Sequence, residues 1–124
     1  MARRVLIADD EPNIVLSLEF LMEQSGYEVR VARTGEEALA AVEAFRPDLV
    51  LLDVMMPRKN GYEVLQAIRG DPARRATKVV LLTAKGRDVD MEKGLGLGAD
   101  AYVTKPFATR DLVARVRDLL GDGG

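Results

Sequence analysis

The sequence predicts a single α/β domain: a doubly wound, three-layer (βα)5 sandwich around a parallel five-stranded sheet. Apolar runs of strand length recur at intervals of about 20 to 30 residues, and stretches with helical spacing of apolar residues follow each run. The 124 residues suffice for one hydrophobic core but leave no room for a second domain. Strict alternation of strand and helix is typical of a parallel sheet covered by helices on both faces.

Five segments are expected to form the strands. They are "RVLIA", "EVRVA", "DLVLLD", "KVVLLT" and "AYVTK", at residues 4–8, 28–32, 48–53, 78–83 and 101–105. The first, third and fourth are nearly continuous valine, leucine and isoleucine, as strands buried on both faces must be, whereas the second alternates like an edge strand. Right-handed crossovers of this length favour the flavodoxin-like strand order 2-1-3-4-5.

Five helices are expected, at residues 13–24, 36–45, 62–69, 88–95 and 109–120. Thr34 and Thr109 stand where helices should start, and Gly26 and Gly70 stand where helices should end. The segment 88–95 is the weakest of the five, because a glycine costs a helix about 1 kcal/mol relative to alanine. Residues 1–120 are expected to form the domain, and 121–124 a flexible tail or the start of a linker.

Composition excludes several classes of function. With 18 basic and 20 acidic residues the formal charge is -2, which offers no basic surface for nucleic acid or for an anionic membrane. The chain has no cysteine and no histidine, so any bound metal must be a hard cation that prefers oxygen. No apolar segment reaches the length of a secretory signal or a membrane span, and a cytoplasmic protein is expected.

The candidate site lies where the strands end. In a sheet of this order, ligands bind beyond the carboxyl ends of the strands, where the order reverses between the first and third strands. The polar residues expected there are Asp9, Asp10, Asp53, Thr83 and Lys105. Mg²⁺ suits them, with Mn²⁺ as a substitute, because it binds through one or two carboxylates and leaves positions for phosphate oxygens. Asp53 is then the expected nucleophile toward a phosphoryl group, whose oxygens Thr83 and Lys105 would bind.

Four motifs, "ADDEP", "LLDVMMPRKNGYEVL", "LLTAKG" and "GADAYVTKPF", together resemble the receiver domains of response regulators in two-component signalling, in particular those like the chemotaxis regulators. The resemblance covers nearly the whole chain. It implies that a sensor histidine kinase or a phosphotransfer protein phosphorylates Asp53. It also implies that Asp9, Asp10 and Asp53 hold Mg²⁺ together with the backbone carbonyl of Met55, and that Lys105 pairs with the phosphoryl group and precedes a cis peptide bond.

The resemblance implies a conformational switch as well. Thr83 and Tyr102 would rearrange around the phosphoryl group and change the surface formed by the fourth helix, fifth strand and fifth helix, which a downstream effector domain or protein reads. Met55 and Lys85 flank the site in positions that tune the lifetime of the phosphoryl group. Neither side chain is suited to positioning water, so we expect slow self-dephosphorylation and no turnover of an external substrate.

One departure from the family concerns dimerisation. The family often carries a second acid in a "GADDY" stretch, but this chain reads "GADAY", with Ala101 in that place. Asp100, Lys93, Arg115 and Arg117 remain as candidates for pairs between chains. The expectation is a monomer or a weak, phosphorylation-dependent homodimer.

Other interpretations were weighed. Asp10 and Glu11 before Pro12 also suit a plain helix start. A pseudo-receiver scaffold usually lacks part of the site, whereas nothing is missing here. A phosphatase of the haloacid-dehalogenase type needs a second acid where this chain has Met55. The stretch "GLGLGA" satisfies the dinucleotide-binding pattern, but it follows an expected helix rather than a strand.

Overall fold

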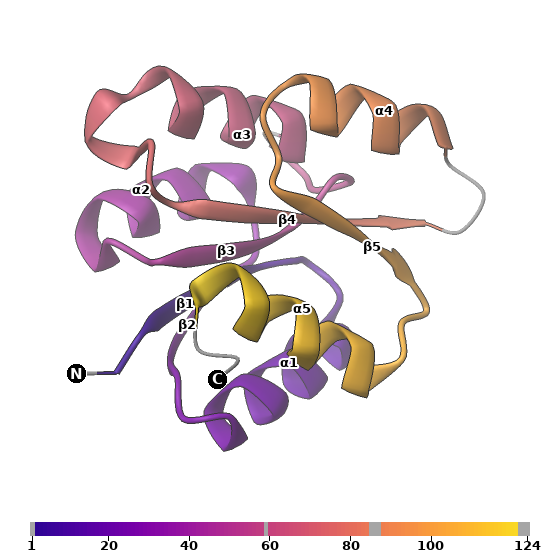
Figure 1. Cartoon of the computed structure of the whole chain (residues 1–124). Coiled ribbons are helices and arrows are strands. Elements are labelled where there is room, and N and C mark those ends of the chain that lie inside the picture. The colour runs from indigo at the N-terminus through magenta and orange to yellow at the C-terminus, as the bar shows by residue number, and fades with distance from the viewer. Residues whose placement is uncertain (1, 59, 85–87, 122–124) are drawn as a thin grey trace.

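The computed structural model describes residues 2–58, 60–84 and 88–121 of the chain. Five parallel strands form one sheet in the order β2-β1-β3-β4-β5, which confirms the predicted topology (Figure 1). The strands are β1 (Arg4–Ala8), β2 (Glu28–Ala32), β3 (Leu49–Asp53), β4 (Lys78–Ala84) and β5 (Ala101–Lys105). Asp48, which was predicted to begin the third strand, lies just outside β3, and its carboxylate accepts a hydrogen bond from the Arg4 amide at 2.8 Å.

The helices also lie where the sequence predicts them. They are α1 (Pro12–Gln24), α2 (Gly35–Phe45), α3 (Gly61–Gly70), α4 (Asp88–Gly96) and α5 (Thr109–Leu120), with an unpredicted 3-10 turn η1 (Pro72–Arg74) before β4. The Thr34 hydroxyl accepts a backbone hydrogen bond at the start of α2, as predicted. Thr109 is not a cap: it is the first residue of α5, and Ala108 occupies the cap position without a side-chain bond.

The sheet separates two hydrophobic cores, because successive side chains of a strand point to opposite faces. Helices α2, α3 and α4 cover one face, and α1 and α5 cover the other (Figure 1). In β1, Leu6 and Ala8 belong to the first core, while Val5 and Ile7 belong to the second. All of β3 is buried and β2 is partly exposed, so the central and edge positions are as the sequence predicts. In the central strands β1, β3 and β4, the polar residues stand at or next to the strand ends.

Glycine lets α3 begin directly against the end of β3. The Gly61 amide donates to the Val54 carbonyl at 2.9 Å. A Cβ on Gly61 would overlap the backbone carbonyl oxygen of Asp53 and lie 2.8 Å from Val54 Cα. A larger residue at this position would therefore push the helix away from the strand end that carries Asp53.

Glycine has a similar use in α4. A Cβ on Gly94 would overlap Leu81 Cδ1 on β4, so the residue that weakens this helix also allows it to approach the sheet. Beside it, the Lys93 ammonium lies 4.5 Å from the centre of the Tyr62 ring on α3. A cation at this distance from an aromatic face is attracted by the ring. Lys93 therefore contributes to packing between α3 and α4, in addition to any role at the surface.

Arg69, near the end of α3, fastens the loop between α4 and β5. Its guanidinium donates to the carbonyl of Gly98 at 2.7 Å, to the carbonyl of Thr77 at 2.8 Å and to the Asp100 carboxylate at 2.7 Å. Asp100 also accepts the Val79 amide at 2.8 Å. The same carboxylate oxygen accepts both bonds, so Asp100 takes part in contacts within the chain, and its role in pairs between chains stays a prediction.

Candidate functional site

The predicted site residues meet at one edge of the sheet. Asp9 directly follows β1, Asp53 ends β3 and Lys105 ends β5, and parallel strands bring these ends to the same side. Asp9 is 0% exposed and Asp53 is 5% exposed. Two buried carboxylates side by side repel each other and are costly to desolvate, so the fold must supply groups that stabilise them.

Three carboxylates form a cluster that is able to hold a cation. One oxygen each from Asp9, Asp10 and Asp53 lies within 4.8 Å of the other two. Asp10 is exposed, so the cluster opens to solvent on its side. Backbone amides fix the two buried carboxylates: Glu11 donates to Asp9 Oδ1 at 2.9 Å, and Met55 donates to Asp53 Oδ1 at 3.1 Å. Ligands that are all oxygen, with an open side, suit a hard divalent cation such as Mg²⁺.

Lys105 faces the cluster and partly neutralises it. Its Nζ lies 2.8 Å from Asp9 Oδ2 and 3.4 Å from Asp53 Oδ2, and the side chain is only 14% exposed. A third carboxylate, Glu11 Oε1, lies 3.1 Å from the same Nζ. Sequence reasoning predicted Lys105 but missed Glu11, which it treated only as part of a helix start. The available signal was the run of three acids at residues 9–11, whose last member has the longest side chain.

This arrangement changes the proton affinity of the buried groups. Burial and the neighbouring Asp9 carboxylate raise the pKa of Asp53 to about 7, against the opposing effects of Lys105 and the Met55 amide. Burial by itself lowers the pKa of Lys105, but hydrogen bonding to Asp9 and the charge of Asp53 outweigh it and raise the pKa above its usual value. Lys105 therefore stays charged at neutral pH, and a further cation beside Asp53 would favour its ionised form.

Thr83, in β4, places a hydroxyl at the same edge. The residue is 2% exposed, and among the described residues its Oγ1 has no hydrogen-bond partner. A buried polar group without a partner typically costs about 1 to 3 kcal/mol. The hydroxyl is thus able to donate to an oxygen that enters the site.

For the other predicted residues, no side-chain hydrogen bond with the carboxylate cluster is seen among the described residues. The Met55 side chain is 62% exposed beside Asp53, and Lys85 lies outside the described residues. Tyr102 is half-buried on β5 and lines a pocket of about 290 Å³ with residues that include Phe107 and Arg115. The Lys105-Pro106 peptide bond is cis, as the resemblance implied.

The glycines of "GLGLGA" lie at the end of α4 and in the loop before β5, which confirms that they do not follow a strand.

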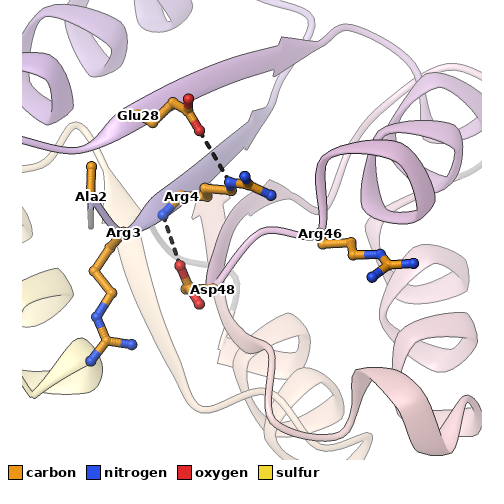
Figure 2. Close-up of a pocket in the computed structure, with 6 residues that line it drawn as sticks. All are labelled: Ala2, Arg3, Arg4, Glu28, Arg46 and Asp48. Carbon is orange, nitrogen blue, oxygen red and sulfur yellow. Dashed lines mark hydrogen bonds and ion pairs between the residues drawn. The ribbon is translucent and has the colours of Figure 1, made fainter.

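A second hollow, of about 690 Å³, lies at the opposite end of the sheet (Figure 2). Its lining consists of Ala2, Arg3, Arg4, Glu28, Arg46 and Asp48. Arg4 donates three hydrogen bonds there. Its Nε donates to Glu28 at 3.1 Å, its backbone amide donates to Asp48, and its Nη1 donates to the Phe45 carbonyl at 2.9 Å. The hollow thus contains bonds that join the starts of β1, β2 and β3, and none of the predicted site residues lines it.

Comparisons with known proteins agree with this geometry. The sequence profile described as "Response regulator receiver domain" matches residues 5–117. The chain is 44% identical over 120 residues to the alkaline phosphatase synthesis transcriptional regulatory protein PhoP of Bacillus subtilis (strain 168), covering 97% of this chain and 49% of that protein. It therefore spans about half the length of this relative.

Solved structures match over the whole fold. A putative response regulator from Chloroflexus aurantiacus J-10-fl superimposes with a TM-score of 0.94 at 35% identity, covering 98% of this chain and 99% of that one. The BeF3-activated DrrB receiver domain superimposes with a TM-score of 0.88 at 38% identity, with the same coverage of 98% and 99%. Within the described part of the chain, no helix is both long and apolar enough to cross a bilayer.

Proposed function

The chain belongs to the response regulator receiver domain family of two-component systems, and we propose on that basis that Asp53 is its phosphoacceptor. Receiver domains of this family work with histidine kinases and with effector domains. The observation that carries the proposal is the convergence of Asp9, Asp53 and Lys105 from three separate strand ends, which sets two buried carboxylates beside one ammonium. A helix start or a turn explains each residue alone, but neither explains why the ends of β1, β3 and β5 carry them together.

The donor set fits Mg²⁺. Asp9, Asp10 and Asp53 would hold the ion, with the backbone carbonyl of Met55 completing the protein ligands. When bound, the cation supplies positive charge that neutralises the phosphoryl oxygens. The raised pKa of Asp53 supports this assignment, because a carboxylate that is costly to ionise alone gains most from a cation beside it.

The proposed transfer step uses Asp53, Lys105 and Thr83. An oxygen of the Asp53 carboxylate attacks the phosphorus of a phosphohistidine, and a mixed anhydride forms. The phosphorus–nitrogen bond breaks, and its electron pair stays on the imidazole nitrogen. The Lys105 ammonium, 3.4 Å from Asp53 Oδ2, donates to a phosphoryl oxygen, and the unpartnered Thr83 hydroxyl donates to another. In a separate dephosphorylation step, water attacks the phosphorus of the mixed anhydride, the bond from phosphorus to the Asp53 oxygen breaks, and inorganic phosphate leaves the regenerated carboxylate. The exposed Met55 thioether does not assist this step.

Thr83 and Tyr102 are proposed to carry the signal outward. A hydroxyl that moves to a phosphoryl oxygen vacates space beside β5, where Tyr102 is half-buried next to a pocket. The surface of α4, β5 and α5 would then differ between the two states, and the phosphoryl group would stabilise a state that is otherwise minor. PhoP is a transcriptional regulator, which supports an effector domain or protein as the partner that reads this surface. With Asp100 held by Arg69, a monomer or a weak dimer remains the proposed state.

The test is incubation with a small acyl phosphate and Mg²⁺, followed by mass spectrometry of the intact chain. The parent should gain the mass of one phosphoryl group, and the gain should be lost on treatment with hydroxylamine, which cleaves acyl phosphates. Asp53→Asn should gain nothing. Glu36→Gln, at an exposed acid that pairs with Arg58, is the matched control and should be phosphorylated like the parent. A parent that gains no mass would refute the proposal in favour of a scaffold without phosphorylation.

A further inference from the structure

The ammonium of Lys105 is surrounded by carboxylates in this structure, and it donates a hydrogen bond to Glu11 Oε1. It carries three N–H groups and lies near three carboxylates, at 2.8 Å from Asp9, 3.1 Å from Glu11 and 3.4 Å from Asp53. Asp9 and Asp53 belong to the proposed cation site, but Glu11 does not. A phosphoryl oxygen that recruits Lys105 therefore competes with these carboxylates for the ammonium.

Of the three carboxylates near Lys105, Glu11 is the one whose contact costs least to break. Its side chain is 59% exposed, whereas Asp9 is fully buried and Asp53 is the group that becomes modified. Glu11 occupies the cap position of α1, yet its side chain makes no cap hydrogen bond there. The carboxylate instead reaches Lys105, which lies 94 residues away in the sequence. Water replaces an exposed partner at small cost, so this contact is the one that breaks most easily.

We propose that Glu11 is a positioning residue that holds Lys105 in the unphosphorylated protein and competes with the phosphoryl group on Asp53 for the same ammonium. The inference rests on the proposed function of Asp53 and adds a residue that tunes it. Glu11 touches neither Asp53 nor the cation cluster through its side chain, so it acts through Lys105. Its effect is to favour the unphosphorylated state, by an amount set by a partly exposed ion pair.

The test measures how tightly the protein binds beryllofluoride, a mimic of the phosphoryl group, in the presence of Mg²⁺. Glu11→Gln removes the charge, while Glu11→Asp keeps the charge but shortens the side chain and so removes the contact. Both variants should bind about two- to fivefold more tightly than the parent, the range expected for the loss of a partly exposed ion pair. Glu36→Gln is the matched control for a general change of charge and should bind like the parent.

The outcomes separate the possible causes. Tighter binding by Glu11→Gln alone would assign the effect to general charge repulsion and overturn the proposed contact. Equal binding by the parent and both Glu11 variants would overturn the inference but leave the function of Asp53 intact. An absence of binding by every protein would overturn the proposed function itself.

A spectroscopic measurement reports on Lys105 directly. In the free parent, the NMR signals of the Lys105 ε-methylene should differ from those in the beryllofluoride complex. In free Glu11→Gln and Glu11→Asp, they should move part of the way toward the complex, because the ammonium has lost the partner that it gives up on binding. A role for Glu11 confined to the stability of α1 would leave these signals in place, and that result would contradict the proposal.

Discussion

The replacement of Asp53 by asparagine should change how the stability of the protein depends on pH. Burial and the charge of Asp9 raise the pKa of Asp53 from 3.8 to about 7 in the folded protein. The folded state therefore binds a proton at this carboxyl group more tightly than the unfolded state does. The contribution of such a group to stability is fully present below the lower pKa and is lost as the pH rises through the higher one. Asparagine has no proton to lose, so the variant should escape this effect.

The size of the effect follows from the two pKa values. The complete loss amounts to about 4 kcal/mol, because each tenfold difference in proton affinity is worth about 1.4 kcal/mol. Part of that loss is already present at pH 5. Between pH 5 and pH 8, the Asp53→Asn variant should gain about 2 to 3 kcal/mol of unfolding free energy relative to the parent.

The measurement is urea unfolding followed by circular dichroism at several pH values, in buffer that contains a chelator. The difference between the variant and the parent should grow steadily from pH 5 to pH 8. Addition of Mg²⁺ should reduce it, because a cation stabilises the ionised form of the parent. Asp118→Asn, at an exposed position on α5, is the control and should follow the parent at every pH. If the profile of Asp53→Asn also runs parallel to that of the parent, burial and Asp9 do not act on Asp53 as described.

Three further changes test other parts of the structure. Mg²⁺ at about a hundredfold over its dissociation constant should stabilise the parent by about 2.7 kcal/mol in thermal unfolding, and an equal gain in the Asp10→Ala, Asp53→Ala double variant would place the cation elsewhere. Gly61→Ala should cost about 1 to 3 kcal/mol in urea unfolding, because its Cβ meets the backbone of β3, whereas Gly70→Ala, with open space around it, should cost nothing. Met55→Asn should release phosphate faster after phosphorylation, since an amide is able to orient water; unchanged release would show that Met55 does not set the lifetime.

The fold was predictable because its signals are local and agree with one another. The apolar run of β3, the alternation of β2 and the cap at Thr34 each depend on neighbouring residues, and each appears in the structure as expected. Two of the differences at element ends have local causes. Thr109 has the chemistry of a cap but lies one residue inside α5, and the proline at position 72 begins a short 3-10 turn rather than a loop.

The site was predictable only in part. Asp9, Asp53 and Lys105 stand at the ends of apolar strands, and the rule for parallel sheets places strand ends together. Glu11 and Arg69 were missed because each acts through a side chain that reaches a distant segment, and such contacts leave no periodic pattern in the sequence. The roles assigned to Thr83, Tyr102 and Met55 stay predictions, since they concern events that follow phosphorylation.

The three bonds made by Arg69 restrain the loop that follows α4. The guanidinium is planar and rigid, and it donates hydrogen bonds to Thr77, Gly98 and Asp100 at the same time. The loop that follows α4 is thereby anchored to α3, while the first turn of α4 comes after β4, which carries Thr83. We therefore expect any displacement of α4 to be a rotation about its carboxyl-terminal end, with the largest amplitude at its first turn. The contacts of Arg69 would lie at the pivot of that rotation.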